Sequence, residues 1–475
     1  MRHVSSLGVG DANPDLVDAS VNGGHENLAP LAGGPSSYPR SRELRERAHK
    51  AIPGGAHTYA KGDDQYPAAA PGFISRGQGC QVWDVDGNRF IEYGMGLRAV
   101  TLGHAHPRTV EAVHKQMLLG NNFTRPAAIE VQAAEELLDL LKFNENDFMV
   151  KFAKNGSDAT SAAIRLARAV TGRDKVLVAN QPFFSADDWF IGTTQMDAGV
   201  PAAVRELTKV FDYNDLASLE AILDANRGEV ACVILEAARN DEPAPNYLSG
   251  VQRLCRDHGA LFVLDEMITG FRWHVGGARA YYRLDPDLCC FGKGMGNGFS
   301  VSALVGRREY MERGGLHKSE PRVFLLSLTH GAESSGLAAA LAVIATYRDE
   351  DVIGHPWRVG ERLASGVREI ARGHGVEQQV EALGMPCNLV FTSRDADGEP
   401  SQPFRTLLLQ ELLQRGVLAP SLVVSYAHDD AVIDETLVAF DGALNVYRRA
   451  LSEGVGGYLR GRAVQPVFRT HAGTV

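Results

Sequence analysis

The feature that most constrains the fold of this chain is an alternation of short apolar runs with helical segments through its middle. The apolar runs occupy residues 148–153, 176–179, 229–235, 260–264 and 288–291. Short runs made almost wholly of apolar residues are typical of strands buried on both faces, and strands that alternate with helices form a mostly parallel sheet. The sequence therefore predicts an α/β fold in which helices cover a mostly parallel sheet.

With 475 residues the chain is too long for one ordinary hydrophobic core, so we expect a large domain and a smaller one. The first residues are rich in Gly, Asn, Ser and Pro and lack periodicity, which is typical of a mobile leader. The expected parts are the leader (1–36), an N-terminal segment that joins the small domain (37–95), a large domain (96–335) and a C-terminal small domain (336–475).

Local patterns give the elements of the smaller parts. A helical pattern begins at Ser41, and two strand-like segments flank the turn at Asp86 and Gly87. Further along, the sequence predicts helices near 107–119 and 128–142, an alanine-rich helix beyond about 336, a strand near 387–392, and helices near 403–415 and 431–452.

Composition excludes several classes of function. The net charge of −10 leaves no basic surface for nucleic acid, and no run of about 18 apolar residues could span a membrane. The six cysteines show no CxxC spacing, which favours a reducing, cytoplasmic setting. His104 and His106 lack a carboxylate or thiolate at ligand spacing, so we expect no metal site there.

Lys293 lies in a glycine-rich segment, FGKGMGNG (291–298), directly after an apolar run. The glycines leave room for a planar ligand against the backbone, and a lysine amine can hold such a ligand covalently. A solvated loop lysine is the alternative.

Asp265 ends another apolar run, so its carboxylate stands at the carboxyl end of a predicted parallel strand, where ligands bind in open α/β sheets. The segment Asn155, Gly156 and Ser157 lies between a strand and a helical pattern, and a helix start of this kind favours phosphate. Helix capping without a ligand is the alternative for both.

Together the three motifs fit pyridoxal 5'-phosphate (PLP), which needs a lysine partner, a phosphate cradle and an anion that keeps its ring nitrogen protonated. The chain resembles the class III (fold type I) aminotransferases, and most nearly the glutamate-1-semialdehyde 2,1-aminomutase branch. The likeness runs from about residue 53 to 451 and includes PGG (53–55), WDVDGN (83–88), LGHAHP (102–107), AIRLARA (163–169), YND (213–215), DEMITGFR (265–272) and GVLAPS (416–421).

The resemblance implies a seven-stranded, mostly parallel sheet in the large domain, and a homodimer with active sites at the subunit interface. It also implies that Lys293 forms the Schiff base and that Asp265 supports the ring nitrogen. The further cofactor contacts that it implies are Asn155, Gly156 and Ser157 at the phosphate, Thr329 reaching the phosphate from the neighbouring subunit, Phe183 and Met267 on the two faces of the ring, and Glu236 beside the site.

Departures from the family pattern gather around the substrate. Leu97 replaces a tryptophan, and Lys61 stands where an arginine is expected to grip the substrate carboxylate. Because lysine is a point charge and not a bidentate partner, this change argues against glutamate-1-semialdehyde as the substrate. Glu333, with Asp63 and Asp64, would suit a polyhydroxylated or cationic substrate, unless these carboxylates are ordinary solvated groups. Lys61 and Glu333 are the substrate-contact candidates.

We therefore expect an aminotransferase that moves an amino group from an amino-acid donor to an aldehyde or ketone by a ping-pong mechanism, with pyridoxamine 5'-phosphate as the intermediate form. Residues 53–64 and 329–333 also look like those of enzymes for amino-sugar and aminoglycoside antibiotic biosynthesis, such as the gentamicin pathway. An aminomutase, epimerase or dehydratase on the same scaffold remains an alternative. A non-catalytic PLP-binding protein is a further one, against which the retention of Lys293 and Asp265 argues.

Overall fold

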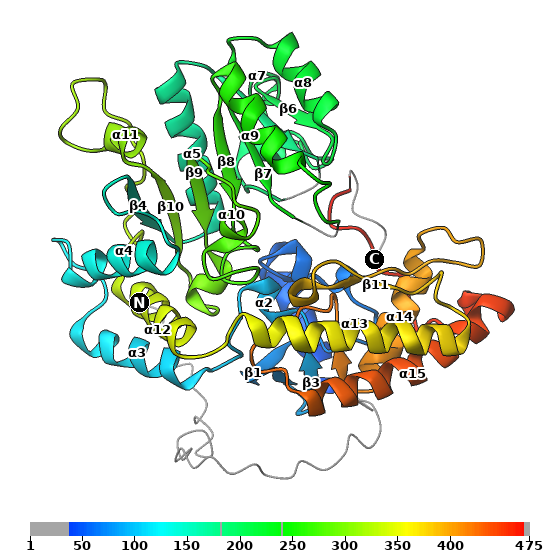
Figure 1. Ribbon diagram of the computed structural model, residues 1–475. Helices are drawn as coiled ribbons and strands as arrows, with labels where there is room; N and C mark the ends of the chain where they lie inside the picture. Colours follow the sequence, from blue (N-terminus) through cyan, green and yellow to red (C-terminus); the bar gives the residue numbers. More distant parts are fainter. Residues whose placement is uncertain (1–37, 181–182, 239–240, 470–475) are drawn as a thin grey trace, which may run out of the picture.

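The computed structural model describes residues 38–180, 183–238 and 241–469. Within these ranges a seven-stranded sheet with the order β4-β10-β9-β8-β7-β5-β6 forms the centre of the larger lobe (Figure 1). β10 runs antiparallel to β4 and β9, and the remaining pairs are parallel. The strands are β4 (Phe148–Ala153), β5 (Lys175–Ala179), β6 (Thr208–Phe211), β7 (Val230–Glu236), β8 (Leu261–Asp265), β9 (Leu288–Phe291) and β10 (Ser302–Arg307). The predicted α/β fold with a mostly parallel sheet is confirmed.

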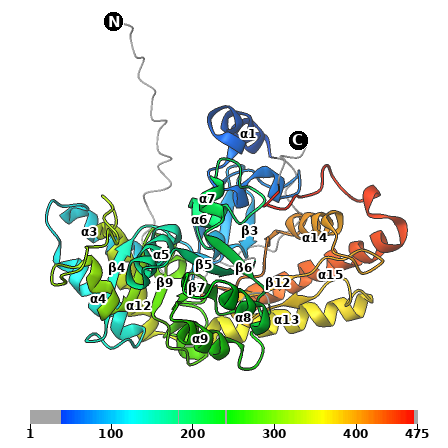
Figure 2. The same cartoon turned by 90° about the horizontal axis from the view of Figure 1, so that it is seen from above.

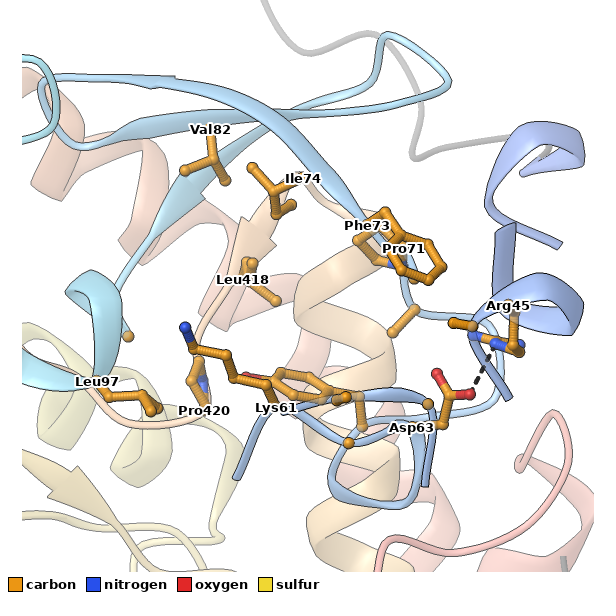
Figure 3. Close-up of a pocket in the computed structure, with 18 of the residues that line it drawn as sticks. Arg45, Lys61, Asp63, Pro71, Phe73, Ile74, Val82, Leu97, Leu418 and Pro420 are labelled. Atoms are coloured by element: carbon orange, nitrogen blue, oxygen red, sulfur yellow. Dashed lines mark ion pairs between the residues drawn. The ribbon is translucent and has the colours of Figure 1, made fainter. Parts of the chain in front are cut away.

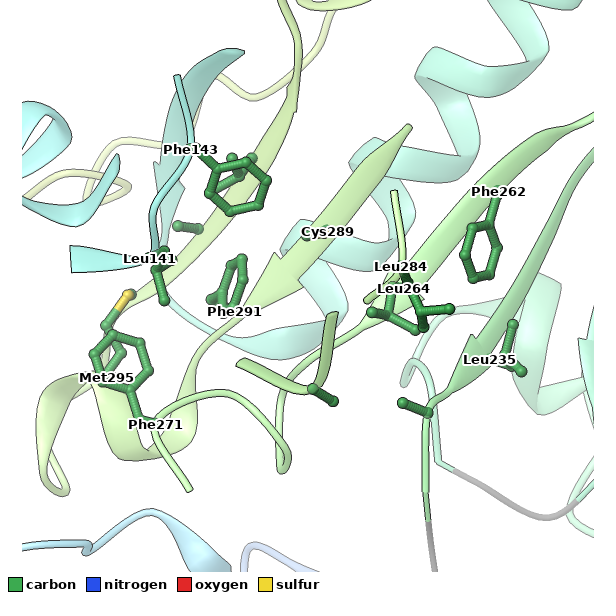
Figure 4. Packing of buried hydrophobic residues seen from close by; sticks show 14 of the residues in the cluster. Leu141, Phe143, Leu235, Phe262, Leu264, Phe271, Leu284, Cys289, Phe291 and Met295 are labelled. Carbon is green, nitrogen blue, oxygen red and sulfur yellow. The ribbon is translucent and has the colours of Figure 1, made fainter. Parts of the chain in front are cut away.

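Side chains of the parallel strands point alternately into two hydrophobic clusters, one on each face of the sheet. In β8, Phe262 and Leu264 belong to one cluster, while Leu261 and Val263 belong to the other. This two-residue period is the geometry of a strand, and both faces are apolar because helices cover both. Figure 4 shows Phe262 and Leu264 beside Leu235 of the neighbouring strand.

The covering helices come from segments on both sides of the strands. α5 (Gly156–Thr171) contributes alanines and leucines to one cluster, and α9 (Tyr247–His258) packs on the opposite one. Outside the sheet, α12 (Ser334–Asp349) packs against α3 (Pro107–Leu119) and α4 (Ala128–Leu140). Short helices complete the lobe: α2 (Met95–Arg98), α6 (Asp188–Ile191), α7 (Ala202–Arg205), α8 (Leu216–Ala225), α10 (Gly277–Tyr281) and α11 (Arg308–Met311).

A second lobe joins residues from the two ends of the described chain. Its four-stranded sheet has the order β1-β2-β3-β13, and β13 pairs in parallel with β3. Three helices pack on a separate hydrophobic cluster at this sheet (Figures 1 and 2). The elements are α1 (Pro39–Ala51), β1 (Ile74–Gln78), β2 (Gln81–Asp84), β3 (Arg89–Glu92), α13 (Gly354–His374), α14 (Gln402–Gln414), β13 (Val417–Leu418) and α15 (Asp430–Glu453). The expected leader, 1–36, lies outside the described residues.

Most predicted elements of this lobe are present, and one differs. β2 and β3 form the expected hairpin, whose turn places Gly87 at a φ of 91°, in the left-handed region that glycine tolerates. The strand expected near 387–392 shrinks to β12 (Val390–Phe391), which pairs with β11 (Ala382–Leu383) after a 3₁₀ turn at Pro386–Asn388. No helix in the described part of the chain is both long and apolar enough to cross a bilayer.

Candidate active site

The carboxyl ends of three neighbouring strands bring the predicted chemistry together. Glu236 ends β7 and Asp265 ends β8, and the two residues pair in register. Lys293 follows β9 by one glycine and begins a 3₁₀ turn with a φ of 45°. Parallel strands end at the same edge of a sheet, so these side chains share one region of the fold.

Asp265 is buried, with 1% of its surface exposed, and one of its carboxylate oxygens has no partner. Oδ1 accepts a hydrogen bond from the backbone N of Met267 at 2.8 Å, while Oδ2 is buried without a hydrogen bond. Burial and the neighbouring Glu236 charge raise the pKa of Asp265 to about 8, against the opposing effect of Lys293. A buried oxygen left without a donor is costly, so this position is suited to a donor from a ligand.

Lys293 occupies a site where its neutral form is favoured. Burial lowers the pKa of the Lys293 amine, and the positive charges of Arg98 and Arg272 lower it further, although Asp265 and Glu236 act in the opposite direction. A neutral amine can attack a carbonyl, whereas a protonated one cannot. Burial, assisted by the two arginine charges, therefore prepares Lys293 for covalent chemistry.

The phosphate motif begins α5, as predicted. The Asn155 side chain caps the helix by accepting a hydrogen bond from the backbone N of Asp158 at 3.2 Å. Ser157 Oγ accepts from the backbone N of Ala186 at 2.8 Å and keeps its O–H free to donate. Capping, the alternative interpretation, thus occurs at Asn155, on a helix start that still offers backbone dipoles and a hydroxyl donor.

Met267 lies between two glycines of the motifs. A Cβ on Gly156 would stand 3.1 Å from Met267 Sδ, and one on Gly292 would stand 2.6 Å from it. The distance at Gly292 is shorter than real Cβ contacts, and the distance at Gly156 is tighter than most of them, so both glycines leave room for the methionine. Met267 therefore connects the start of α5 to the segment that carries Lys293.

Phe183 is placed differently from Met267. Its ring is 53% exposed, packs edge-on against Phe190 at 5.6 Å and stacks with Phe468 at 6.4 Å. These contacts lie within the described residues, and its predicted contact with a cofactor ring stays a prediction.

Thr329 lies in an exposed loop that is anchored by Asn122, whose Nδ2 donates to the Thr329 carbonyl at 3.1 Å. Glu333, a few residues later, precedes α12 and accepts hydrogen bonds from Lys154 Nζ at 2.7 Å and Ser335 Oγ at 2.8 Å. These partners hold the pKa of Glu333 below its usual range despite partial burial. The Glu333 carboxylate is thus neutralised within the chain.

Lys61 lines a cavity of about 460 Å³ beside Leu97 and Pro420 (Figure 3). The expected acidic rim is neutralised, because Asp63 pairs with Arg45 at 3.1 Å and with His49 at 2.9 Å. Asp64 likewise pairs with Arg469. An acidic mouth for a cationic substrate therefore finds no support in these carboxylates.

Two arginines that the sequence reasoning did not single out also act on the site. Arg98 and Arg272 lower the pKa of Lys293, and Arg272 Nη2 donates to the Arg98 carbonyl at 2.8 Å. Arg272 stands inside the quoted segment DEMITGFR, so its position in that motif was an available signal. Arg98 precedes LGHAHP and has no comparable local signal.

The residues present fit PLP as the cofactor. The unpartnered Asp265 Oδ2 suits the N–H of a protonated pyridine ring, and the Lys293 amine suits its aldehyde. The start of α5 suits the phosphate group.

Comparison with known proteins agrees with this geometry. The model of the family described as aminotransferase class III matches residues 62–440. Glutamate-1-semialdehyde 2,1-aminomutase of Desulfitobacterium hafniense is 34% identical over 422 residues, which cover 84% of this chain and 96% of that protein. The corresponding protein of Chloroflexus aggregans is 33% identical over 443 residues, which cover 86% and 98%.

Solved structures show the same architecture. The PLP internal aldimine form of the Sphingopyxis sp. MTA144 FumI protein has a TM-score of 0.79 at 27% identity and covers 87% of this chain and 98% of that one. An omega-transaminase from Sphaerobacter thermophilus has a TM-score of 0.77 at 25% identity, with the same shares covered. The fold is therefore that of the fold type I PLP transferases. The extent of the family match and the identity to the aminomutases agree with the strand-end site, and the chain belongs to the class III aminotransferases.

Proposed function

We propose that this protein is a PLP-dependent aminotransferase that moves an amino group from an amino-acid donor to an aldehyde or ketone. The observation that carries the proposal is the pairing of a lysine of lowered pKa with a buried carboxylate whose Oδ2 has no donor, at the ends of adjacent strands. Family membership and the fold support it.

PLP, when bound, supplies an electron sink that stabilises negative charge on the carbon bearing the amino group. Asp265 Oδ2 would accept the hydrogen bond of the ring nitrogen and keep that nitrogen protonated. Ser157 and the backbone at the start of α5 hold the phosphate. Met267, which lies between Gly156 and Gly292, would pack against the ring.

Lys293 performs two tasks at one atom. Its Nζ would hold the cofactor covalently at rest, and when free it would carry a proton to and from the reacting carbon. The lowered pKa supports both tasks, since the amine must be neutral to accept that proton. With PLP bound, the cofactor would supply the pyridoxamine 5'-phosphate form that stores the amino group, and Lys293 would serve the donor and the acceptor half-reactions alike.

We also propose a homodimer in which Thr329 reaches the partner's site. Exposed apolar side chains support this arrangement near the Thr329 loop. Leu118 is 76% exposed and Leu119 is 75% exposed at the end of α3, and the next segment is tied to Thr329 through Asn122. Exposed apolar groups in such number mark an interaction surface. Further members of this surface are Met117, Phe123, Phe324 and Leu328.

The acceptor we propose is an amino-sugar or aminoglycoside intermediate. The replacements at Leu97 and Lys61 support a substrate other than glutamate-1-semialdehyde. The six cysteines are all buried and free, which supports a reducing, cytoplasmic setting.

A second candidate reaction is aminomutation, because the curated relatives at 34% and 33% identity are named glutamate-1-semialdehyde 2,1-aminomutases.

The test is the absorption spectrum of the purified, PLP-loaded protein before and after addition of L-glutamate and other amino acids. The expected result is loss of the visible band, roughly at 410 to 430 nm, and growth of a band near about 330 nm in the wild type only. The Lys293→Ala variant is the control. No bound chromophore after PLP is added would overturn the central proposal. If the PLP-loaded protein converts its substrate without consuming an amino donor, aminomutation is favoured.

A further inference from the structure

The backbone beside Lys293 contains an unusual left-handed turn. Met95, Gly96, Leu97 and Arg98 have φ values of 41°, 58°, 58° and 71°. Residues with side chains occupy this region at a cost, so a run of them persists only where the surroundings hold it. Arg272 supplies such a hold, because its Nη2 donates to the Arg98 carbonyl at 2.8 Å. The turn fixes where the Arg98 side chain begins.

The Arg98 guanidinium is oriented by one contact and otherwise open. Its Nε donates to Asn388 Oδ1 at 2.8 Å, and within the described part of the chain no carboxylate forms an ion pair with it. Burial lowers the pKa of Arg98 to about 10, which leaves it protonated at neutral pH. An oriented cation with its two terminal nitrogens unbonded is arranged for a planar or tetrahedral oxyanion.

Arg98 and Arg405 line one cavity of about 490 Å³. Arg405 Nη2 donates to the Pro420 carbonyl at 2.8 Å, and its guanidinium lies 5.0 Å from the centre of the Phe391 ring. Among the described residues it too has no carboxylate partner. The rest of the lining is rich in neutral polar groups and contains no Asp or Glu: Gln65, Tyr66, Gln402, Ser421 and Gln465.

The two arginines contrast with other charged groups nearby. Asp63, Asp64 and Glu333 are neutralised by ion pairs within the chain, and Glu92 pairs with His104 at 2.7 Å. The cavity thus presents two positive charges that no ion pair among the described residues neutralises, although the Glu236 charge also acts on Arg98. Its size suits a small ligand group, and its neutral polar lining suits hydroxyls.

We propose that this cavity is the subsite for an oxyanion on the substrate, a carboxylate or a phosphate, held between Arg98 and Arg405. The inference rests on the proposed function, since it assigns part of the substrate to a cavity lined by Arg98, whose charge acts on Lys293. In this arrangement Arg98 and Arg405 bind the negative charge of the substrate, which Lys61 alone would bind only as a point charge. Among the amino-sugar and aminoglycoside intermediates proposed as acceptors, the subsite therefore selects those that carry a phosphate or a carboxylate beside their hydroxyls.

The experiment is calorimetric titration of the PLP-loaded protein with two probes, inorganic phosphate and succinate, in a buffer free of both. The cofactor occupies the other phosphate position, so a probe reports on the cavity. The variants are Arg98→Gln and Arg405→Gln, with Arg98→Lys and Arg405→Lys as charge-retaining versions. Arg415→Gln is the control, because Arg415 pairs with Glu411 at 2.7 Å and does not line this cavity. The visible PLP band of each variant reports that it folds and binds cofactor.

The wild type should bind at least one probe, and the probe that binds identifies the group as phosphate or carboxylate. Each Gln variant should raise its Kd at least about tenfold, each Lys variant less, and Arg415→Gln not at all. If neither probe binds the wild type, or if the Gln and Lys variants all bind like it, the subsite is overturned. If Arg405→Gln fails to fold, the Kd values of Arg98→Gln and Arg405→Lys test the subsite in its place. Probe binding does not depend on turnover. If the protein binds a probe but no amine changes its visible PLP band, the aminotransferase proposal is refuted and the oxyanion subsite stands.

Discussion

Glu236 and Asp265 are register partners at the ends of β7 and β8, so two carboxylates meet beside the single amine of Lys293. Mutual repulsion and burial favour one proton on Asp265, while Lys293 opposes this. A positive charge brought by a ligand would reverse the balance. The following predictions test this relationship and the packing around it.

Asp265→Asn tests the pH dependence of the cofactor-free protein. The folded pKa of Asp265 is about 8, against 3.8 for an ordinary carboxyl. A raised folded pKa stabilises the fold fully below the unfolded value, and this stability is lost as the pH rises through about 8. The variant has no proton to lose. Without PLP it should gain stability relative to wild type, by a few kcal/mol, between about pH 5 and pH 8.

Thermal unfolding midpoints over this pH range give the measurement. With PLP bound the relative gain should vanish, because the ring nitrogen then pairs with the carboxylate, and amino transfer by the variant should fall at least about a hundredfold. A constant difference between the two proteins at every pH would contradict the assignment.

Glu236→Gln should lower the pKa of Asp265, because the Glu236 charge is the second cause of its elevation after burial. The loss of stability of the cofactor-free protein on raising the pH should therefore end at a lower pH and be smaller. The same unfolding series measures it. In the double variant with Asp265→Asn the shift should disappear, and its persistence there would assign the effect to another group.

Gly292→Ala should displace Met267, because the added Cβ would stand 2.6 Å from its Sδ. The φ of 179° at Gly292 suits any residue, so the cost is steric and should be about 1–3 kcal/mol. Urea unfolding measures it. Met267→Ala should remove most of this cost in the double variant. Gly373→Ala, in α13 with open space around it, is the control and should not destabilise. Equal costs with and without Met267 would be the contrary result.

Leu119→Glu should weaken the proposed homodimer, because it places a charge among the exposed apolar side chains at the end of α3. We expect the dimer Kd to rise at least about a hundredfold, measured by sedimentation, and activity to fall with the fraction of dimer. Val438→Glu changes a comparably exposed side chain on α15 and should leave association unchanged. A wild type that is monomeric at all concentrations would refute the dimer itself.

Local patterns predicted much of this protein. Continuous buried apolar runs marked β5, β7, β8 and β9, because strands buried on both faces need no polar alternation, and an apolar run interrupted only by Lys151 marked β4. Two strands of the sheet had no such signal. β6 carries Lys209 in its middle, and β10 contains Ser302 and Gly306, so neither reads as a continuous apolar run.

The sequence alone placed Lys293, Asp265 and Asn155 at strand ends or a helix start, because each follows directly from the element beside it. Only the tertiary structure decided which distant residues act on them. Arg98 and Arg405 line one cavity although they lie far apart in the sequence. Glu333, expected at the substrate, is paired with Lys154. Strand and helix periods are local, whereas the charge that a side chain meets depends on long-range packing, which no local pattern encodes.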